Sequence, residues 1–237
     1  MWCRMFSIEY NENNLDNIYD HFLNKFNNNI DLKNHRFYIE SNNLGYGERA
    51  FHAMWDEIIL SFNDIKFLEI GVYKGQTISL VKMLMRLYHK KGTVLGVTPL
   101  NNTGDKYSTY DQTNYEPIIK NLFNYFNLDF DINNEILKGL STDKEIISKL
   151  KKQKFNIIYV DGGHDYNTVI SDIDLCLEIL ENNGLIVFDD CSNFKKFNKN
   201  LFLGHYEVAL AIRDKLENNK NYQEIMCVGH NRVFRKK

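Results

Sequence analysis

The sequence predicts an α/β domain with a mostly parallel sheet, a C-terminal antiparallel hairpin and an N-terminal helical extension. Three observations lead to this prediction. Short apolar runs alternate with helical patterns through the middle of the chain, as in successive βαβ units. Several of these runs are apolar throughout, which is typical of strands buried on both faces. The last two runs are separated by a short turn, which indicates a hairpin and not another crossover.

The elements follow from apolar spacing and turn residues. Helical spacing predicts helices over 15–26 and, after a polar stretch, over 48–62. The predicted strands are, in chain order, 66–70, 93–97, 132–138, 156–160, 185–188, 222–227 and 232–234. The predicted helices among these strands are 76–88, 116–126, 143–151, 168–181 and 208–216. We therefore divide the chain into a helical extension or cap, residues 1–62, and one seven-stranded α/β domain, residues 63–237.

Composition excludes several classes of protein. The 237 residues are 43% hydrophobic and 25% charged, as in ordinary globular chains. A formal net charge of −2 gives no general attraction to nucleic acid or to an anionic membrane. No apolar run approaches the ~20 residues of a membrane span, and the N-terminus lacks a signal-peptide pattern. The four cysteines lie far apart, which favours reduced thiols. We expect a cytoplasmic protein without nucleic-acid or membrane partners.

The turn after the first core strand carries the first candidate site. Ligands of open parallel sheets bind beyond the carboxyl ends of the strands. Gly71 permits a sharp turn there, and Gly75 permits close approach of the backbone to a ligand. A dinucleotide fingerprint would need glycine where this chain has Glu69. The carboxylate of Glu69 favours a cofactor with a cationic end over a diphosphate. A turn that binds no ligand is the alternative.

Acidic residues end two further predicted strands. Asp161 follows the strand 156–160, and Asp189 and Asp190 follow the strand 185–188. Parallel strands end at one edge of the sheet, so these acids are expected to converge, with His164 beside them. Carboxylate oxygens suit Mg²⁺, and His164 suits a general base or a further ligand. The alternative is that the acids are helix caps or loop residues.

Three segments, 67–75, 159–164 and 185–190, together resemble class I S-adenosylmethionine-dependent methyltransferases. More narrowly, the chain is similar to the branch of metal-dependent macrocin and mycinamicin sugar O-methyltransferases and cephalosporin hydroxylase-like proteins. The resemblance covers about residues 45–234. It implies a single Rossmann-like class I methyltransferase domain that uses S-adenosyl-L-methionine and, in this branch, Mg²⁺.

The resemblance also implies roles for individual residues. His164 would be the catalytic base, and the metal ligands would be Asp161, Asp189 and Asp190. The cofactor-binding residues would be Glu69, Gly71, Val72, Tyr73, Lys74, Gly75, Thr98, Ser141 and Asp161.

The end of the second core strand departs from the pattern of the class. Many class I methyltransferases bind the ribose hydroxyls with an acid where this chain has Thr98. A hydroxyl offers a weaker, single contact, so Asp105 or Asp111 in the following loop could take over. Ser141 is the candidate for adenine contact, and the alternative is that it caps the next helix.

The segment before the first core strand is the candidate for substrate contact. Tyr46 and Arg49, with His52, could line a substrate pocket, and the segment 204–206 is a second rim candidate. The favoured function is Mg²⁺-assisted methyl transfer to a hydroxyl of a sugar or small metabolite, and a homo-oligomer is compatible with the sequence. The alternatives are a non-catalytic cofactor-binding protein, and a hydroxylase or oxidoreductase. Against the hydroxylase, the two-histidine, one-carboxylate set of non-haem iron enzymes is not evident.

Overall fold

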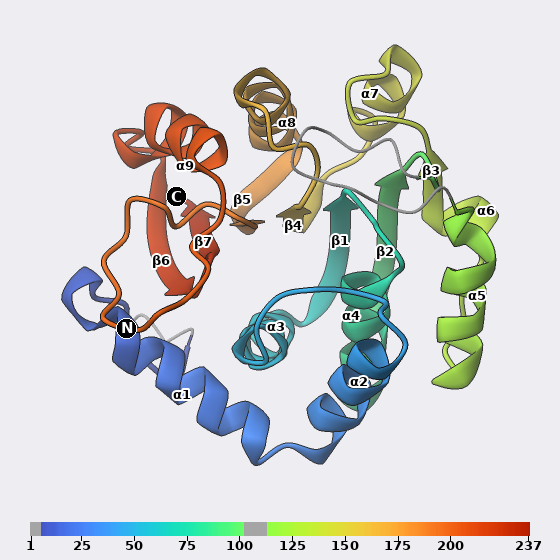
Figure 1. Cartoon of the computed structure of the whole chain (residues 1–237). Helices are drawn as coiled ribbons and strands as arrows, with labels where there is room; N and C mark the ends of the chain where they lie inside the picture. The colour runs from blue at the N-terminus through green and yellow to red at the C-terminus, as the bar shows by residue number, and fades with distance from the viewer. Residues whose placement is uncertain (1–5, 102–112) are drawn as a thin grey trace.

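The computed structural model describes residues 6–101 and 113–237, and a seven-stranded sheet forms its centre (Figure 1). The strand order is β3-β2-β1-β4-β5-β7-β6. The strands are β1 (Asp64–Ile70), β2 (Lys91–Thr98), β3 (Ile136–Lys138), β4 (Phe155–Val160), β5 (Leu180–Phe188), β6 (Tyr222–Val228) and β7 (Asn231–Lys236). Strands β1 to β5 pair in parallel, and β7 is antiparallel to both β5 and β6. The predicted fold class is confirmed.

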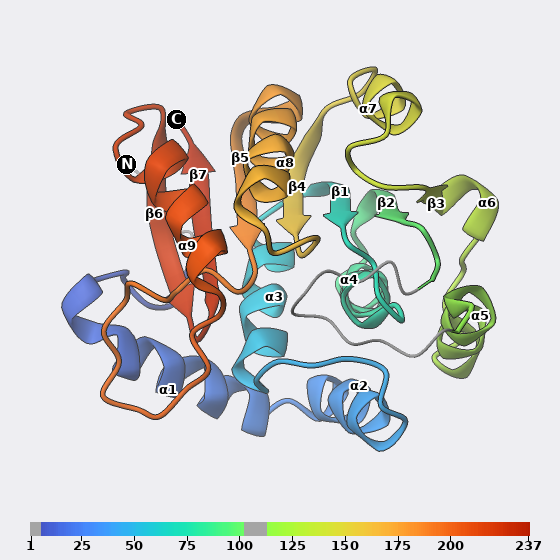
Figure 2. The same ribbon diagram turned by 45° about the horizontal axis from the view of Figure 1, so that its top comes forward.

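Helices cover both faces of this sheet (Figures 1 and 2). One face carries α1 (Leu15–Asn27), α3 (Ala50–Leu60) and α4 (Gln76–Leu87), and the other carries α7 (Lys144–Leu150), α8 (Tyr166–Ile179) and α9 (Tyr206–Ile212). The remaining α-helices of the described residues are α2 (Ile30–Ser41), α5 (Tyr115–Tyr125) and the single turn α6 (Ile132–Glu135); a 3-10 turn, η1 (Glu12–Asn14), precedes α1, and a π-helical turn, η2 (Arg213–Glu217), follows α9. Within the described residues, no helix is long and apolar enough to cross a membrane.

Alternate residues of the central strands enter two separate apolar layers. In β1, Phe67 packs in the layer of α3, where its ring lies 5.5 Å from that of Trp55. The next residue, Leu68, belongs to the opposite layer, which includes Ile173 of α8. Trp55 is fully buried, so the N-terminal extension shares its core with the sheet.

Three elements differ from the sequence prediction, and one of them is β5, which begins at Leu180, within the predicted helix 168–181. The segment predicted as a polar stretch contains α2, whose buried face includes His35 and Arg36 beside Leu32 and Ile39. Because two of the buried residues are polar, the sequence shows no continuous helical spacing of apolar residues here, and the helix was not predicted. The predicted strand 132–138 is shorter than expected because Asp131 caps a helical turn by accepting the N–H of Asn133. Only Ile136–Lys138 pairs with β2.

The buried face of α2 contains a chain of polar contacts between three helices. Nδ1 of His35 lies 3.0 Å from Nε2 of His52, and Nε2 of His35 lies 3.0 Å from Oγ of Ser79. Burial lowers the pKa of His35 to about 3 and holds the pKa of His52 well below its usual range. Both imidazoles are therefore neutral in the folded protein.

This pair should make the protein less stable in acid. In the unfolded chain each histidine takes up a proton below pH ~6.5, so stability falls as the pH drops from ~6.5 toward 3. Each group contributes ~1.4 kcal/mol per pH unit. We expect the slope of unfolding free energy between pH 6 and pH 4, from urea denaturation, to be smaller by about that amount in His52→Gln. His89→Asn, at a remote turn of positive φ, should keep the wild-type slope. Equal slopes in wild type and His52→Gln would contradict the prediction.

Candidate active site

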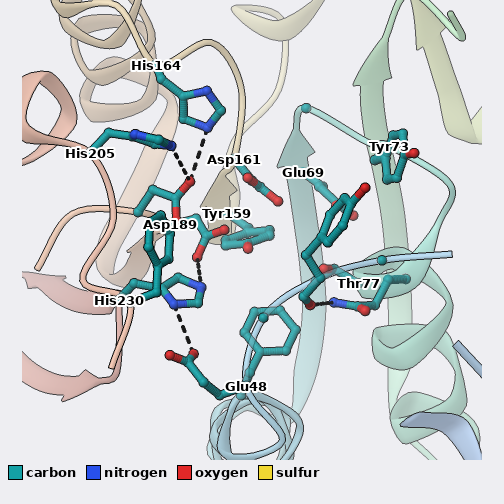
Figure 3. A pocket seen from close by; sticks show the side chains of 18 of the residues that line it. Glu48, Glu69, Tyr73, Thr77, Tyr159, Asp161, His164, Asp189, His205 and His230 are labelled. Atoms are coloured by element: carbon teal, nitrogen blue, oxygen red, sulfur yellow. Dashed lines mark hydrogen bonds and ion pairs between the residues drawn. The ribbon is translucent and has the colours of Figure 1, made fainter. Parts of the chain in front are cut away.

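The carboxyl ends of β1, β2, β4 and β5 meet at one edge of the sheet, beside two adjoining cavities. The larger has a volume of about 650 Å³ and the smaller about 250 Å³. Gly71, Tyr73 and Asp161 line both. The larger cavity contains the acids and histidines shown in Figure 3, and the smaller contains Thr98 and Ser141. An elongated ligand could therefore cross the end of β1 from one cavity into the other.

Glu69 lies in β1 at the wall of the larger cavity (Figure 3). Its side chain is buried, and its Oε2 has no hydrogen-bond partner among the described residues. Burial raises the pKa of Glu69 to about 8, and the charge of Asp189 contributes to this rise. A buried carboxyl oxygen without a partner is costly, so a cationic group of a ligand would stabilise the charged form of Glu69.

Gly71 holds the sharp turn after β1. Its φ is +98°, and a Cβ at this position would overlap the backbone carbonyl of Asp161. Gly75 also has a positive φ, +92°, but a Cβ there would meet the Ile119 side chain of α5 at 3.3 Å. The structure therefore explains Gly75 by helix packing, whereas the sequence predicted close approach to a ligand.

This difference predicts unequal costs of two matched substitutions. Gly71→Ala combines a positive φ with a backbone overlap and should lower the free energy of unfolding by about 3 kcal/mol or more. Gly75→Ala has the same unfavourable φ but meets only a side chain, so ~1 kcal/mol is expected. Urea denaturation of both variants measures the difference. Equal losses would show that the Asp161 carbonyl does not constrain position 71.

The other loop residues divide between the cavities and the surface. Val72 is buried and lines the smaller cavity. Tyr73 lies between the cavities, with its ring 5.9 Å from that of Tyr46. Lys74 lines neither cavity: its Nζ donates to the carbonyl of Asn43 at 3.1 Å. Of the loop positions expected to bind cofactor, Lys74 and Gly75 are therefore not brought to the cavities.

Thr98 and Ser141 both line the smaller cavity, as they must if they bind the same cofactor. The hydroxyl of Thr98 accepts the N–H of Leu100 at 3.1 Å, which leaves its O–H available as a donor. Ser141 is not a helix cap, because α7 begins after Asp143. Asp105 and Asp111, the substitutes considered for the ribose contact, lie outside the described residues.

The three acids lie together on the wall of the larger cavity, and none of them caps a helix. The cap of α8 is Asp165, and α9 begins only at Tyr206. Burial raises the pKa of Asp161 well above its usual range, and repulsion from Asp189 and Asp190 adds to it. Carboxylates crowded in this way fit a bound cation, which would relieve their repulsion.

Two residues that the sequence analysis missed join this cluster (Figure 3). His230, in the turn between β6 and β7, lies with Nε2 3.1 Å from Oδ1 of Asp189 and with Nδ1 2.9 Å from Oε2 of Glu48. Burial opposes charge on both His230 and Asp189, but their mutual attraction outweighs it. This attraction raises the pKa of His230 and lowers that of Asp189. The signal available in the sequence was the short turn predicted over 228–231, since a hairpin strand paired with β5 brings His230 to the same edge of the sheet.

His164 lies where the sequence predicted it, beside the acids. Its Nε2 is 3.2 Å from Oδ2 of Asp190, and His205 approaches the same oxygen to 3.6 Å. His205 belongs to the segment named as a rim candidate. The sequence analysis expected mainly oxygen ligands at the cluster. The structure also places imidazole nitrogens there, because imidazoles contact Asp189 and Asp190. Two histidines and one carboxylate, a set that was not evident in the sequence, are brought together here.

The predicted substrate residues separate in the structure. Tyr46 is exposed and lines the larger cavity. Arg49 is not brought there, because Glu40 of α2 holds its guanidinium at 3.0 Å. His52 is also absent from the lining, since it is fully buried against His35. Glu48 and Phe51 line the cavity instead.

Comparison with known proteins identifies the family of this chain. A family model described as "Methyltransferase domain" matches residues 68–191, more than half of the chain. The chain belongs to this methyltransferase family. It is a class I, S-adenosylmethionine-dependent methyltransferase, as the resemblance of its motifs implied. The matched residues begin in β1 and end just after Asp190, so they include the loop of Gly71 and all three acids.

The methyltransferase also resembles one curated protein and many solved structures. It is 28% identical over 165 residues to an uncharacterized protein of Acanthamoeba polyphaga mimivirus, a match that covers 67% of this chain and 66% of the relative's length. An O-methyltransferase from Bacillus cereus, solved with S-adenosylhomocysteine, aligns with a TM-score of 0.56 at 11% identity, over 87% of this chain and 90% of that one. A methyltransferase from Podospora anserina, also bound to S-adenosylhomocysteine, aligns with a TM-score of 0.58 at 13% identity, over 98% and 99%.

A third structure, an O-methyltransferase of tomaymycin synthesis from Streptomyces achromogenes with S-adenosylmethionine, gives a TM-score of 0.56 at 9% identity, over 88% of this chain and 90% of that one. At these identities the three structures share the fold with this methyltransferase.

Proposed function

We propose that this methyltransferase transfers the methyl group of S-adenosylmethionine to a hydroxyl of a sugar or other small metabolite, with assistance from Mg²⁺. The observation that carries the proposal is the position of the acids and His164 in a cavity that shares a wall with a second, smaller cavity. The N-terminal residues 1–62 would act as a cap, since Tyr46, Glu48 and Phe51 line that cavity.

Residues at the end of β1 would hold the cofactor across the two cavities. Glu69, buried and without a partner at Oε2, fits the ammonium end of S-adenosylmethionine. Thr98 and Ser141, in the smaller cavity, would contact the ribose and adenine. The acids would then lie in the same cavity as the amino-acid end of the cofactor.

Asp161, Asp189 and Asp190 would hold the cation. When bound, Mg²⁺ lowers the pKa of a coordinated hydroxyl and neutralises the carboxylates. The chain itself supplies the base: the imidazole of His164 would accept the hydroxyl proton as the O–C bond forms and the methyl–sulfur bond breaks, which releases S-adenosylhomocysteine. His230, placed 3.1 Å from Asp189, would keep that carboxylate oriented and ionised.

The lining of the larger cavity supports a polar acceptor with an apolar face. Aromatic rings of Tyr46, Phe51, Tyr159 and Phe202 lie in the same cavity as the carboxylates. Rings stack on the apolar face of a sugar or similar metabolite, and carboxylates accept its hydroxyl groups.

The proposed function can be tested by calorimetry and a transfer assay. Isothermal titration should show binding of S-adenosylmethionine to the full chain without Mg²⁺. Methyl transfer to a panel of sugars and small hydroxylated metabolites should require Mg²⁺ and stop in excess chelator. Transfer that is unchanged in chelator would contradict the role of the acids.

Glu69 should contribute strongly to cofactor affinity. A hydrogen bond to a charged group contributes about 1.5–3 kcal/mol, so Glu69→Gln should weaken binding of S-adenosylmethionine about 10–100-fold. Glu40→Gln, which lies outside both cavities, is the matched control and should bind normally. Normal affinity in Glu69→Gln would place the ammonium group elsewhere.

A further inference from the structure

Two imidazoles, both labelled in Figure 3, and one carboxylate lie close together in the lining of the larger cavity. They belong to His164, His205 and Asp190, and one ligand atom of each lies within 4.8 Å of the other two. The two rings lie 4.6 Å apart between centroids. The side chains are 12%, 23% and 15% exposed, respectively, so solvent ions can reach them.

Backbone contacts fix His205 against Asp190. The N–H of His205 donates to the carbonyl of Asp190 at 2.8 Å, and Gly204 forms an isolated antiparallel bridge with Cys191. Gly204 has a φ of +89°, and any side chain there would overlap the backbone of Asp190. The glycine therefore permits the close approach that brings the His205 imidazole to the Asp190 carboxylate.

The turn that carries His164 is tied to the same segment. Asp165 caps α8 by accepting the N–H of Thr168, which fixes the residue next to His164. The N–H of Tyr166 donates to Glu207 in the first turn of α9 at 3.0 Å. The relative position of the two histidines is thus fixed by hydrogen bonds of the backbone next to each of them, and not only by the conformations of their side chains.

We propose that His164, Asp190 and His205 form a binding site for a divalent transition-metal ion of the Zn²⁺ or Co²⁺ type. Imidazole nitrogen is a good ligand for these ions and a poor one for Mg²⁺, which prefers oxygen. Three protein ligands with remaining positions for water are typical of accessible zinc sites. The site differs in donor chemistry from the acid cluster, although Asp190 belongs to both.

Occupation of this site would inhibit methyl transfer, a consequence that rests on the proposed function. A lone pair of His164 that binds an ion cannot accept the proton of a hydroxyl. The same ion would also take an oxygen of Asp190 from the Mg²⁺ cluster. The structure therefore predicts inhibition by Zn²⁺ that excess Mg²⁺ relieves poorly.

The metal titration itself needs neither substrate nor cofactor. Metal-free full-length protein is titrated with Co²⁺, and the visible absorption of the bound ion is followed, with calorimetry of Zn²⁺ in parallel. We expect one tight site that a large excess of Mg²⁺ does not displace. His205→Ala and His164→Ala should each weaken Co²⁺ binding at least about tenfold. His89→Asn, which removes an imidazole at the far end of α4, should bind like wild type.

Each outcome decides the proposal. Loss of the Co²⁺ spectrum in both histidine variants, with normal binding of S-adenosylmethionine as evidence of folding, supports it. Unchanged Co²⁺ affinity in His205→Ala, or equal competition by Mg²⁺, would overturn it. Failure of the transfer assay would remove only the inhibitory consequence, because the binding measurement is independent of turnover.

Discussion

Replacing His164 by alanine is expected to lower the turnover number of methyl transfer about 10²–10⁴-fold, the usual contribution of a general base. The reason is geometric: Nε2 of His164 lies 3.2 Å from Oδ2 of Asp190, closer than Nε2 of His205 at 3.6 Å. The affinity for S-adenosylmethionine should change little, since His164 is not among the residues proposed to hold the cofactor, which are Glu69, Thr98 and Ser141. Single-turnover kinetics and calorimetry measure the two quantities separately.

A structural role for His164 would give a different pattern. If alanine merely disturbed the turn after β4, cofactor affinity and stability would fall together with the rate. Added imidazole should partly restore turnover in His164→Ala, because a small base can occupy the vacated space. A wild-type rate in the variant would exclude His164 as the base, and Asp161 or Asp165 would then be tested.

Replacing Asp190 by asparagine should have an effect of similar size. Loss of a carboxylate at the cation position removes several kcal/mol of transition-state stabilisation, so a fall of about 10³-fold in turnover is expected. Asparagine is suitable because Asp190 has a φ of +51°, which asparagine also tolerates. Chelator should reduce wild-type turnover to a similar level, and Mg²⁺ should restore it.

The matched control is Asp174→Asn on α8. Asp174 is exposed and pairs with Lys215 on the surface, so turnover should stay at the wild-type rate. Binding of S-adenosylmethionine should survive in Asp190→Asn. Full turnover in that variant, or in excess chelator, would show that the acids serve only the structure.

The catalytic candidates were largely predictable because they lie at the ends of strands. Asp161, Asp189 and Asp190 follow apolar runs directly, and parallel strands end at one edge whatever their order in the sheet. His164 is close to Asp161 along the chain, so its place at the cluster was also predictable. Helix α2 was not, because His35 and Arg36 on its buried face interrupt the apolar period.

The sequence by itself determined the fold class, the family and the acids, since these depend on local periodicity and on short motifs within single turns. The tertiary structure decided which distant residues meet them. His230, in the turn of the β6–β7 hairpin, contacts Asp189, and Glu48 of the N-terminal extension contacts His230. The bridge between Gly204 and Cys191 brings His205 to Asp190. The tertiary structure also pairs Arg49 with Glu40 in a salt bridge outside the cavity. Such meetings depend on strand register and on packing between segments far apart along the chain, and no local pattern encodes them.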